Sequence, residues 1–95
     1  MVNLSGYGYW LNFLLACNVV QIKKVRQNLG ANIRRFRQKA KLTQEELAEK
    51  ADFHPVYISQ IEGGHKALSI EAAWKISKAL HIPMSHLFRG IDGFE

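Results

Sequence analysis

The fold of this chain is decided by residues 43–62, which read TQEELAEKADFHPVYISQIE. Thr43 and Glu46 have the spacing of a capping box, in which each side chain bonds to the other residue's backbone N–H at the start of a helix. A helix is therefore predicted over Gln44–Lys50. The apolar residues that follow its start mark one buried face: Leu47, Ala48 and Ala51.

A second helix start follows after a short turn. Pro55 occupies a first helical position, where its missing N–H costs nothing, although His54 before it is a poor capping residue. Ile58 and Ile61 are three residues apart and give this helix, predicted over Pro55–Glu62, a buried side. Two short helices joined by a tight turn are typical of a helix-turn-helix.

The segment resembles the helix-turn-helix of phage repressors and Cro-type regulators, the xenobiotic-response-element group. Counted from Gln44, that family has a small residue at the fifth position, usually glycine at the ninth, and branched apolar residues at the fifteenth and eighteenth. This chain has Ala48, Asp52, Ile58 and Ile61 at those positions. Asp52 departs from glycine, but aspartate tolerates a left-handed backbone conformation. The resemblance extends from about Leu29 to about Arg89 and implies a lambda-repressor-like domain.

Upstream of the motif, an apolar stripe has the spacing of one amphipathic helix face. The resemblance implies a first helix near Gly30–Lys41, and the stripe suggests that this helix begins earlier, around Gln21. Gly30 interrupts it at a cost of about 1 kcal/mol relative to alanine. The stripe consists of Ile22, Val25, Leu29, Ile33, Phe36 and Ala40.

Downstream of the motif, two more helices are predicted. Ser69 caps a fourth helix, with Trp74 half-buried beside its inward face of Ile70, Ala73, Ile76 and Leu80. Pro83 opens a short fifth helix that ends at Gly90. Ile91 and Phe94 follow with little core left to cover them. The fold class is therefore all-α, a compact bundle of about five helices.

The positive charge of the chain is concentrated in one stretch. The formal net charge is +5, and residues 23–41 hold eight basic residues and no acidic one. The remainder of the chain holds five basic and eight acidic residues, so all of the excess positive charge lies in this arm. Such an arm suits a polyanion such as DNA, although a solvated basic helix face has the same composition.

Residues 1–22 carry no charged side chain and form an apolar extension before a helix-turn-helix domain that spans residues 23–95. Three states are open for this extension: a dimer-contact or packing segment, a loosely ordered segment, or a membrane anchor. Aromatic residues near one end and Lys23-Lys24 at the other suit an anchor. Three polar amide side chains interrupt the apolar run, so a membrane span is not favoured.

The third helix is the expected recognition helix. In a helix-turn-helix the second helix of the motif enters the major groove of DNA. Its apolar residues turn inward, so Pro55, Val56, Ser59 and Gln60 face the other way. Gln60 can bond to N6 and N7 of adenine, and Val56 offers methyl groups to thymine. In the resembled repressors the residues matching Val56 and Gln60 read bases, whereas Pro55 has no side-chain donor and is expected to make shape contact at most.

Phosphate contacts are expected on both sides of this helix. In the resembled family a glutamine matching Gln44 spans from the start of its helix to a phosphate, where free N–H groups form an anion site. The backbone N–H groups of Gly64, His65 and Lys66, with the Lys66 amine, are placed to clamp phosphate. Tyr57 either reaches a phosphate or packs against the preceding helix. The remaining candidates are Ser59, Arg34, Arg35 and Lys41.

Arg37 and Glu62 are assigned a structural role. In the resembled family an arginine of the first helix and a glutamate that ends the third form a buried ion pair, and these two residues match those positions. Arg37 is therefore removed from the DNA contacts. Arg34, Arg35 and Lys41 lack such a partner, which makes them better phosphate candidates.

The resemblance implies a sequence-specific transcriptional regulator that binds double-stranded DNA as a homodimer on a palindromic operator. One alternative is a protein-interaction module, such as an antitoxin that binds its toxin through residues 1–22 or 91–95. Another is a membrane-tethered regulator. An enzyme is not supported, because no nucleophile motif or phosphate loop is present, and the histidines lack metal-ligand spacing, so no metal or cofactor is expected. The single Cys17 excludes an internal disulfide and fits a cytoplasmic, nucleoid-associated protein.

Overall fold

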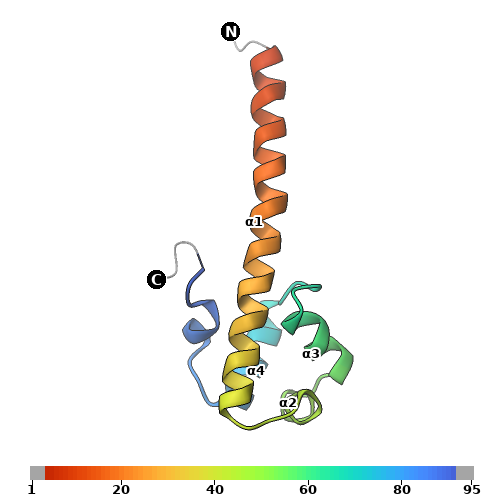
Figure 1. The fold of residues 1–95 in the computed structure, drawn as a ribbon, viewed down its shortest axis with the longest axis vertical. Helices are drawn as coiled ribbons and strands as arrows, with labels where there is room; N and C mark the ends of the chain where they lie inside the picture. The colour runs from red at the N-terminus through yellow and green to blue at the C-terminus, as the bar shows by residue number, and fades with distance from the viewer. Residues whose placement is uncertain (1–3, 92–95) are drawn as a thin grey trace.

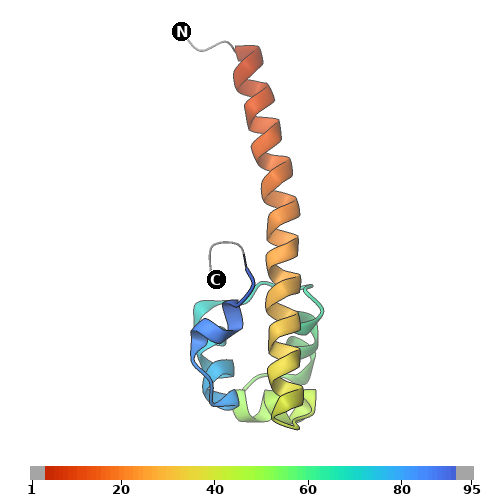
Figure 2. The ribbon, with the colours of Figure 1, turned by 60° about the vertical axis from the view of Figure 1, so that its left-hand side comes forward.

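The computed structural model describes residues 4–91, with side chains from Ile22 onward. This part of the chain is all-α and contains no strand. A long helix runs through a compact body, and its N-terminal half projects clear of that body (Figures 1 and 2). The helices are α1 (Leu4–Lys39), α2 (Gln44–Ala51), α3 (Pro55–Glu62), α4 (Ile70–Leu80) and the 3-10 helix η1 (Met84–Phe88).

The predicted elements are present, with two differences. The fifth helix is a short 3-10 helix rather than an α-helix, since only five residues separate Pro83 from Arg89. The first helix begins at Leu4 and not near Gln21. No proline interrupts residues 4–39, so nothing forces the backbone out of the helix there.

The expected boundary between residues 22 and 23 therefore falls inside one continuous helix. Residues 4–22 form about five turns of α1, at 3.6 residues per turn. Within the described residues, none of the helices combines the length and the hydropathy that crossing a membrane requires.

The turn between α2 and α3 depends on Asp52. Its backbone has φ 61° and ψ 50°, the left-handed conformation expected at this position. That conformation lets the next residue, Phe53, donate its N–H to the carbonyl of Ala48 at 2.8 Å and so close the C-terminus of α2. The departure from glycine is therefore accommodated by aspartate, as predicted.

A side chain caps the start of each of α2, α3 and α4. The Thr43 hydroxyl accepts from the Glu46 N–H at 3.1 Å, and the Glu46 carboxylate accepts from the Thr43 N–H at 2.9 Å. Ser69 accepts from the N–H of Ala72 at 3.0 Å. His54, although a poor cap by statistics, caps α3, because its Nδ1 accepts from the Val56 N–H at 3.1 Å.

The core joins the inward faces of all the helices in the body. The predicted inward residues of α2 and α3 are buried, as are Ala73, Ile76 and Leu80 of α4. Ile70 was expected to face inward, but 81% of its surface is exposed, because the first residue of α4 lies beyond the edge of the core. Trp74 is 53% exposed, close to the half-buried state predicted. Ala40 is exposed beyond the end of α1.

Ile91 was expected to lie uncovered, but it is 6% exposed and belongs to the core. Two asparagines of α1 hold this C-terminal segment in place. The Asn28 amide donates to the carbonyl of Gly90 at 2.8 Å. The Asn32 amide donates to the carbonyls of Leu87 and Arg89, both at 2.8 Å. The sequence analysis missed both asparagines, whose spacing of four beside an apolar stripe was the available signal.

Gly30 is where α1 and α3 touch. A Cβ atom at this position would lie 2.3 Å from the carbonyl oxygen of Ile61 and 2.5 Å from that of Glu62. No side chain fits there, so the C-terminal turn of α3 packs directly on the backbone of α1. The glycine that interrupts the predicted helix pattern is thus required by tertiary packing.

Candidate nucleic-acid interface

The outer face of α3 carries the residues predicted to read bases. Val56 is 54% exposed, while Ile58 on the opposite side is fully buried. Ser59 and Gln60 are exposed, and Pro55 is partly buried at the first position of the helix. The structure therefore places these four side chains together on the side of α3 that faces away from the core.

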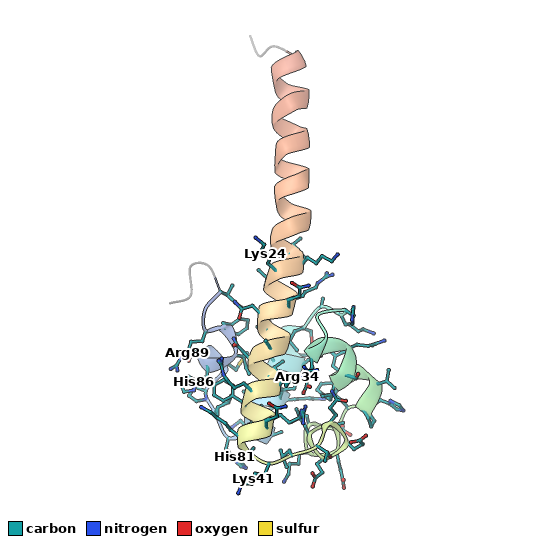
Figure 3. The ribbon with its side chains drawn as sticks, in the orientation of Figure 1. Lys24, Arg34, Lys41, His81, His86 and Arg89 are labelled. Atoms are coloured by element: carbon teal, nitrogen blue, oxygen red, sulfur yellow. The ribbon has the colours of Figure 1, made fainter. Side chains whose placement is uncertain are left out.

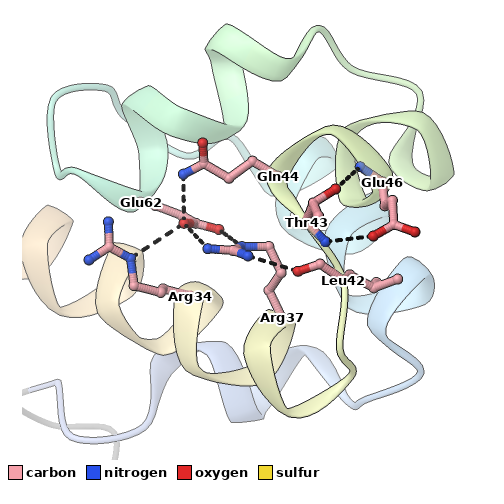
Figure 4. A network of polar contacts seen from close by, with 7 residues as sticks. All are labelled: Arg34, Arg37, Leu42, Thr43, Gln44, Glu46 and Glu62. Atoms are coloured by element: carbon pink, nitrogen blue, oxygen red, sulfur yellow. Dashed lines mark hydrogen bonds and ion pairs between the residues drawn. The ribbon is translucent and has the colours of Figure 1, made fainter.

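A buried carboxylate connects α3 to α1 and α2 (Figure 4). Glu62 has a side chain with no exposed surface. Arg37 Nε donates to Glu62 Oε2 at 2.6 Å, and the terminal nitrogen NH2 of Arg37 donates to Oε1 at 3.0 Å. The same arginine donates to the carbonyl of Leu42 at 2.8 Å, at the start of the turn into α2. The structure thus brings together the two residues that were expected to pair.

Gln44, the first residue of α2, also bonds to this carboxylate. Its Nε2 donates to Glu62 Oε1 at 3.0 Å. The side chain is partly buried, and its carbonyl oxygen and second N–H make no hydrogen bond with a described residue. Glu62 therefore fixes the position of Gln44 at the N-terminus of α2, where the helix dipole favours an anion.

Two of the exposed arginines have partners that the sequence analysis did not find. Arg34 Nε lies 3.5 Å from Glu62 Oε1, while 54% of its side chain stays exposed. Arg35 donates to Asn32 Oδ1 at 3.0 Å, and its guanidinium lies 5.6 Å from the ring centroid of Phe36. The expectation that Arg34 lacks an acidic partner is wrong, because it lies one turn of α1 from Arg37 and reaches the same carboxylate. Arg35 bonds to a neutral amide one turn away and forms no ion pair with a described residue.

The loop after α3 uses its backbone differently from the prediction. The N–H of Gly64 donates to the carbonyl of Ile61 at 3.0 Å, and that of His65 donates to the carbonyl of Gln60 at 2.9 Å. Both groups close the C-terminus of α3, so they are not available to clamp phosphate. The side chains of His65 and Lys66 are exposed and remain available.

Tyr57 and Lys41 complete the predicted set. The Tyr57 ring packs on Phe53, with centroids 4.7 Å apart, and the Lys66 amine lies 5.6 Å from the centroid of the Tyr57 ring. Tyr57 is thus held between the turn and the loop after α3. Lys41 is exposed, with φ 60°, in the turn after α1, and it lies at the opposite end of the body from Lys24 (Figure 3).

The buried carboxylate of Glu62 lies beside the basic side chains of Arg34 and Arg37.

The exposed Glu46 is a second acid with a distinct environment. Its pKa is below the ordinary value, first because the Thr43 backbone N–H donates to its carboxylate and second because of the Thr43 hydroxyl. Among the described residues, no group of three His, Cys, Asp or Glu side chains is placed to hold a metal ion. Of the histidines, His54 caps α3 and His86 stacks on Phe36, with ring centroids 5.9 Å apart.

The sequence model of the family Helix-turn-helix (HTH_3) matches residues 33–87, more than half of the chain. The chain belongs to this family. The control protein C.BamHI of Bacillus amyloliquefaciens is 41% identical over 59 residues, which are 61% of this chain and 73% of that protein. This family is one of transcription regulators, so the chain is a helix-turn-helix DNA-binding regulator and not an enzyme.

Two solved structures share the fold. The restriction-modification controller protein C.AhdI from Aeromonas hydrophila superposes with a TM-score of 0.66 at 28% identity, and the match covers 66% of this chain and 96% of that one. The clp gene regulator ClgR from Corynebacterium glutamicum gives a TM-score of 0.68 at 33% identity, over 73% of each chain. Their likeness agrees with the resemblance drawn from the sequence.

Proposed function

We propose that this chain acts as a homodimer on a palindromic operator, with α3 in the major groove of each half-site. The observation that carries the proposal is the exposed face of α3. Val56 and Gln60 present a methyl surface and an amide on a helix whose other face is locked by Ile58, Ile61 and Glu62. A fixed helix with an amide and an apolar side chain outward is suited to adenine and thymine edges.

The surroundings of α3 fit contacts with the DNA backbone. Gln44 at the N-terminus of α2 and Arg34 both lie at Glu62, the last residue of α3, and the exposed His65 and Lys66 follow that end. A helix N-terminus and cations grouped at the C-terminal end of a recognition helix are suited to contacts with the DNA backbone. Tyr57, Ser59, Arg35 and Lys41 are kept as further phosphate contacts in this proposal.

The decisive experiment is the selection of random duplex DNA by the purified protein at two salt concentrations. We expect enrichment of a palindrome with half-sites ~10 base pairs apart and binding that weakens steeply with salt. Salt-sensitive binding without an enriched sequence would contradict the proposal, because only nonspecific attraction by the basic arm would then remain.

Two substitutions separate base reading from phosphate contact. Gln60→Ala should relax the preference at one position of each half-site, at a cost of about 1–3 kcal/mol for the preferred base. Lys66→Ala should weaken binding to all sequences alike and reduce the salt slope by about 2, since each of the two protomers loses one contact worth about 1. Parallel titrations of the selected operator and single-base variants measure both effects. Equal losses without any change of preference would refute the assignment of Gln60.

The likeness to C.AhdI and C.BamHI supports a narrower biology, in which the chain controls the expression of a restriction-modification locus. Repeating the selection with fragments of the source genome tests this. Enrichment of DNA upstream of a restriction or modification gene would support it, and enrichment of unrelated promoters would argue for a general regulator instead.

A protein-binding role is the second candidate, and α1 is the observation that favours it. Its N-terminal half projects beyond the body, and residues 4–22 of the sequence carry no charge. An exposed helix without charged residues is unusual unless another chain covers it. A complex with an unrelated protein that survives high salt would favour this role over dimerisation.

A further inference from the structure

One stripe of α1 runs along the C-terminal end of α3. Lys23, Gln27, Gly30 and Arg34 recur at intervals of four, three and four residues, which places them on one face of the helix. These residues lie on a different face of α1 from Leu29 and Ile33, which are buried in the core of the body. This face borders the candidate nucleic-acid interface and contains a cation, Lys23, that the proposed DNA contacts do not include.

Two members of the stripe contact residues at the end of α3. Arg34 Nε is 3.5 Å from Glu62 Oε1. At Gly30, a Cβ atom would lie 2.3 Å from the carbonyl oxygen of Ile61. The chain that leaves α3 therefore lies directly on this stripe.

The loop after α3 then continues along the stripe toward the N-terminus of α1. A Cβ atom at Gly64 would lie 2.9 Å from Gln27 Cγ and 3.1 Å from Gln27 Cα, so the loop backbone touches α1 there. His65 and Lys66 follow this contact, and both are exposed. Lys23 is the next position of the stripe, one turn or ~6 Å along the helix axis beyond Gln27.

Lys23 is free to bind a ligand. Its side chain is exposed, and it forms no hydrogen bond or ion pair with another described residue. Glu62, the acid that contacts this stripe, is buried and already bonded to arginine and glutamine side chains. The exposed charged side chains named along this edge, those of Arg34, Lys66 and Lys23, are all basic.

We propose that Lys23 binds a DNA phosphate outside the segment read by α3, as the outer end of a phosphate-binding edge formed by Arg34, Lys66 and Lys23. This inference rests on the proposed function, since it requires that α3 occupies the major groove. It also gives a role to the continuation of α1 upstream of residue 33, where the family match begins. The long first helix extends the DNA footprint by at least one backbone contact.

The neighbouring Lys24 provides a matched control. It is exposed and carries the same charge, but it lies about 100° around the helix from Lys23. Its stripe includes Asn28, which bonds to Gly90, and Arg35, so it follows the side of α1 that packs on the C-terminal segment. Lys24 is labelled in Figure 3. Both lysines contribute equally to long-range attraction, and only Lys23 is placed for the local contact.

The test compares Lys23→Gln with Lys24→Gln in the full chain. The dissociation constant for the selected operator is measured over a range of salt concentrations. Lys23→Gln should reduce the slope of log affinity against log salt by about 1.8, because each phosphate contact on duplex DNA contributes about 0.9 and the homodimer loses one contact per protomer, and Lys24→Gln should leave it unchanged. Thermal melts of both variants should match the parent, because both side chains are exposed.

A second measurement locates the contact on the DNA. Operators shortened step by step at both outer ends should lose about 1.8 units of salt slope with the parent protein and none with Lys23→Gln. Equal slopes for the two lysine variants, or flank dependence that persists in Lys23→Gln, would overturn the proposal. If the selection enriches no sequence, the proposed function fails, while the comparison of the two variants on a random duplex still decides whether Lys23 binds phosphate.

Discussion

At the scale of single residues, Glu62 joins three elements of the motif. Its side chain has no exposed surface, and it accepts bonds from Arg37 of α1 and Gln44 of α2. A buried carboxylate is costly unless it is fully paired. Here the pairing is supplied by residues 18 and 25 positions away in the sequence, so the cost is offset only when the three helices are assembled.

Glu62→Ala should therefore destabilise the protein. The substitution leaves Arg37, whose side chain is only 12% exposed, without its partner. A loss of about 3 kcal/mol in the free energy of unfolding is expected for breaking a buried pair of this kind. Urea denaturation measures it, with the exposed Glu49→Ala as control. A variant that unfolds at the same urea concentration as the parent would disprove the structural role.

Gly30→Ala should also destabilise the protein, although alanine is the better helix former by about 1 kcal/mol. The new Cβ would lie 2.3 Å from the Ile61 carbonyl oxygen, so α3 must shift away from α1. We expect a net loss of about 1–3 kcal/mol, as for overpacked cores. Ala31→Gly, at an exposed site in the same turn, is the control. Its free energy of unfolding should fall only by the difference in helix propensity between alanine and glycine. A stabilised Gly30→Ala variant would show that the two helices do not touch there.

At the scale of elements, the helix starts depend on bonds within four residues of sequence. The capping box of α2, the Ser69 cap of α4 and the left-handed Asp52 all follow from local side-chain chemistry. Such features are predictable because no distant residue takes part. The cap of α3 is equally local but harder to predict, since statistics disfavour histidine as a cap, although the imidazole of His54 accepts the N–H of Val56.

The capping box should make stability depend on pH. The pKa of Glu46 is lowered in the folded protein, chiefly by the Thr43 backbone N–H. A lowered folded-state pKa means that the unfolded state binds the proton first as pH falls, so the contribution of Glu46 is complete above its ordinary value of 4.5 and is lost below it. Glu46→Gln removes this contribution at every pH.

The free energies of unfolding of the parent and Glu46→Gln should therefore differ at pH 7 and converge as the pH falls below about 4. Urea denaturation at pH 7 and pH 3 measures the two differences. Glu45→Gln is the control, because this neighbouring carboxylate makes no hydrogen bond with a described residue. A difference between parent and Glu46→Gln that stays constant with pH would contradict the capping role.

At the scale of the whole molecule, the length of α1 is the main departure from expectation. The helix was expected to begin around Gln21, just before the first residue of the apolar stripe, but it begins at Leu4. Periodicity failed upstream because the apolar residues of 4–22 fall on every side of a helix and the few polar ones are scattered among them, so no face stands out. Such a helix projecting from the body needs a partner, and we propose that two copies pair through it in the homodimer.

Charges introduced on one face of this segment should disrupt the dimer. Leu15 and Ile22 are seven residues apart, and Ile22 is 49% exposed where α1 leaves the body. The double variant Leu15→Lys/Ile22→Lys should dissociate at concentrations at least tenfold higher than the parent, because four lysines would face one another in the pair. Sedimentation velocity measures this. Ile70→Lys, at the 81% exposed start of α4, is the control, and dissociation by that variant instead would place the interface on α4.

The sequence by itself determined the motif: its two helices, the turn at Asp52, the outward residues of α3 and the family follow from contacts and patterns within 20 residues. Only the tertiary structure decided why Gly30 is a glycine, that Arg34 shares the carboxylate of Glu62, and that Ile91 is buried next to a segment held by Asn28 and Asn32. It also showed that the N–H groups of Gly64 and His65 close the C-terminus of α3. The reason is that local hydrogen bonds and periodicity are written in adjacent residues, whereas close approach and shared partners depend on how distant segments are packed.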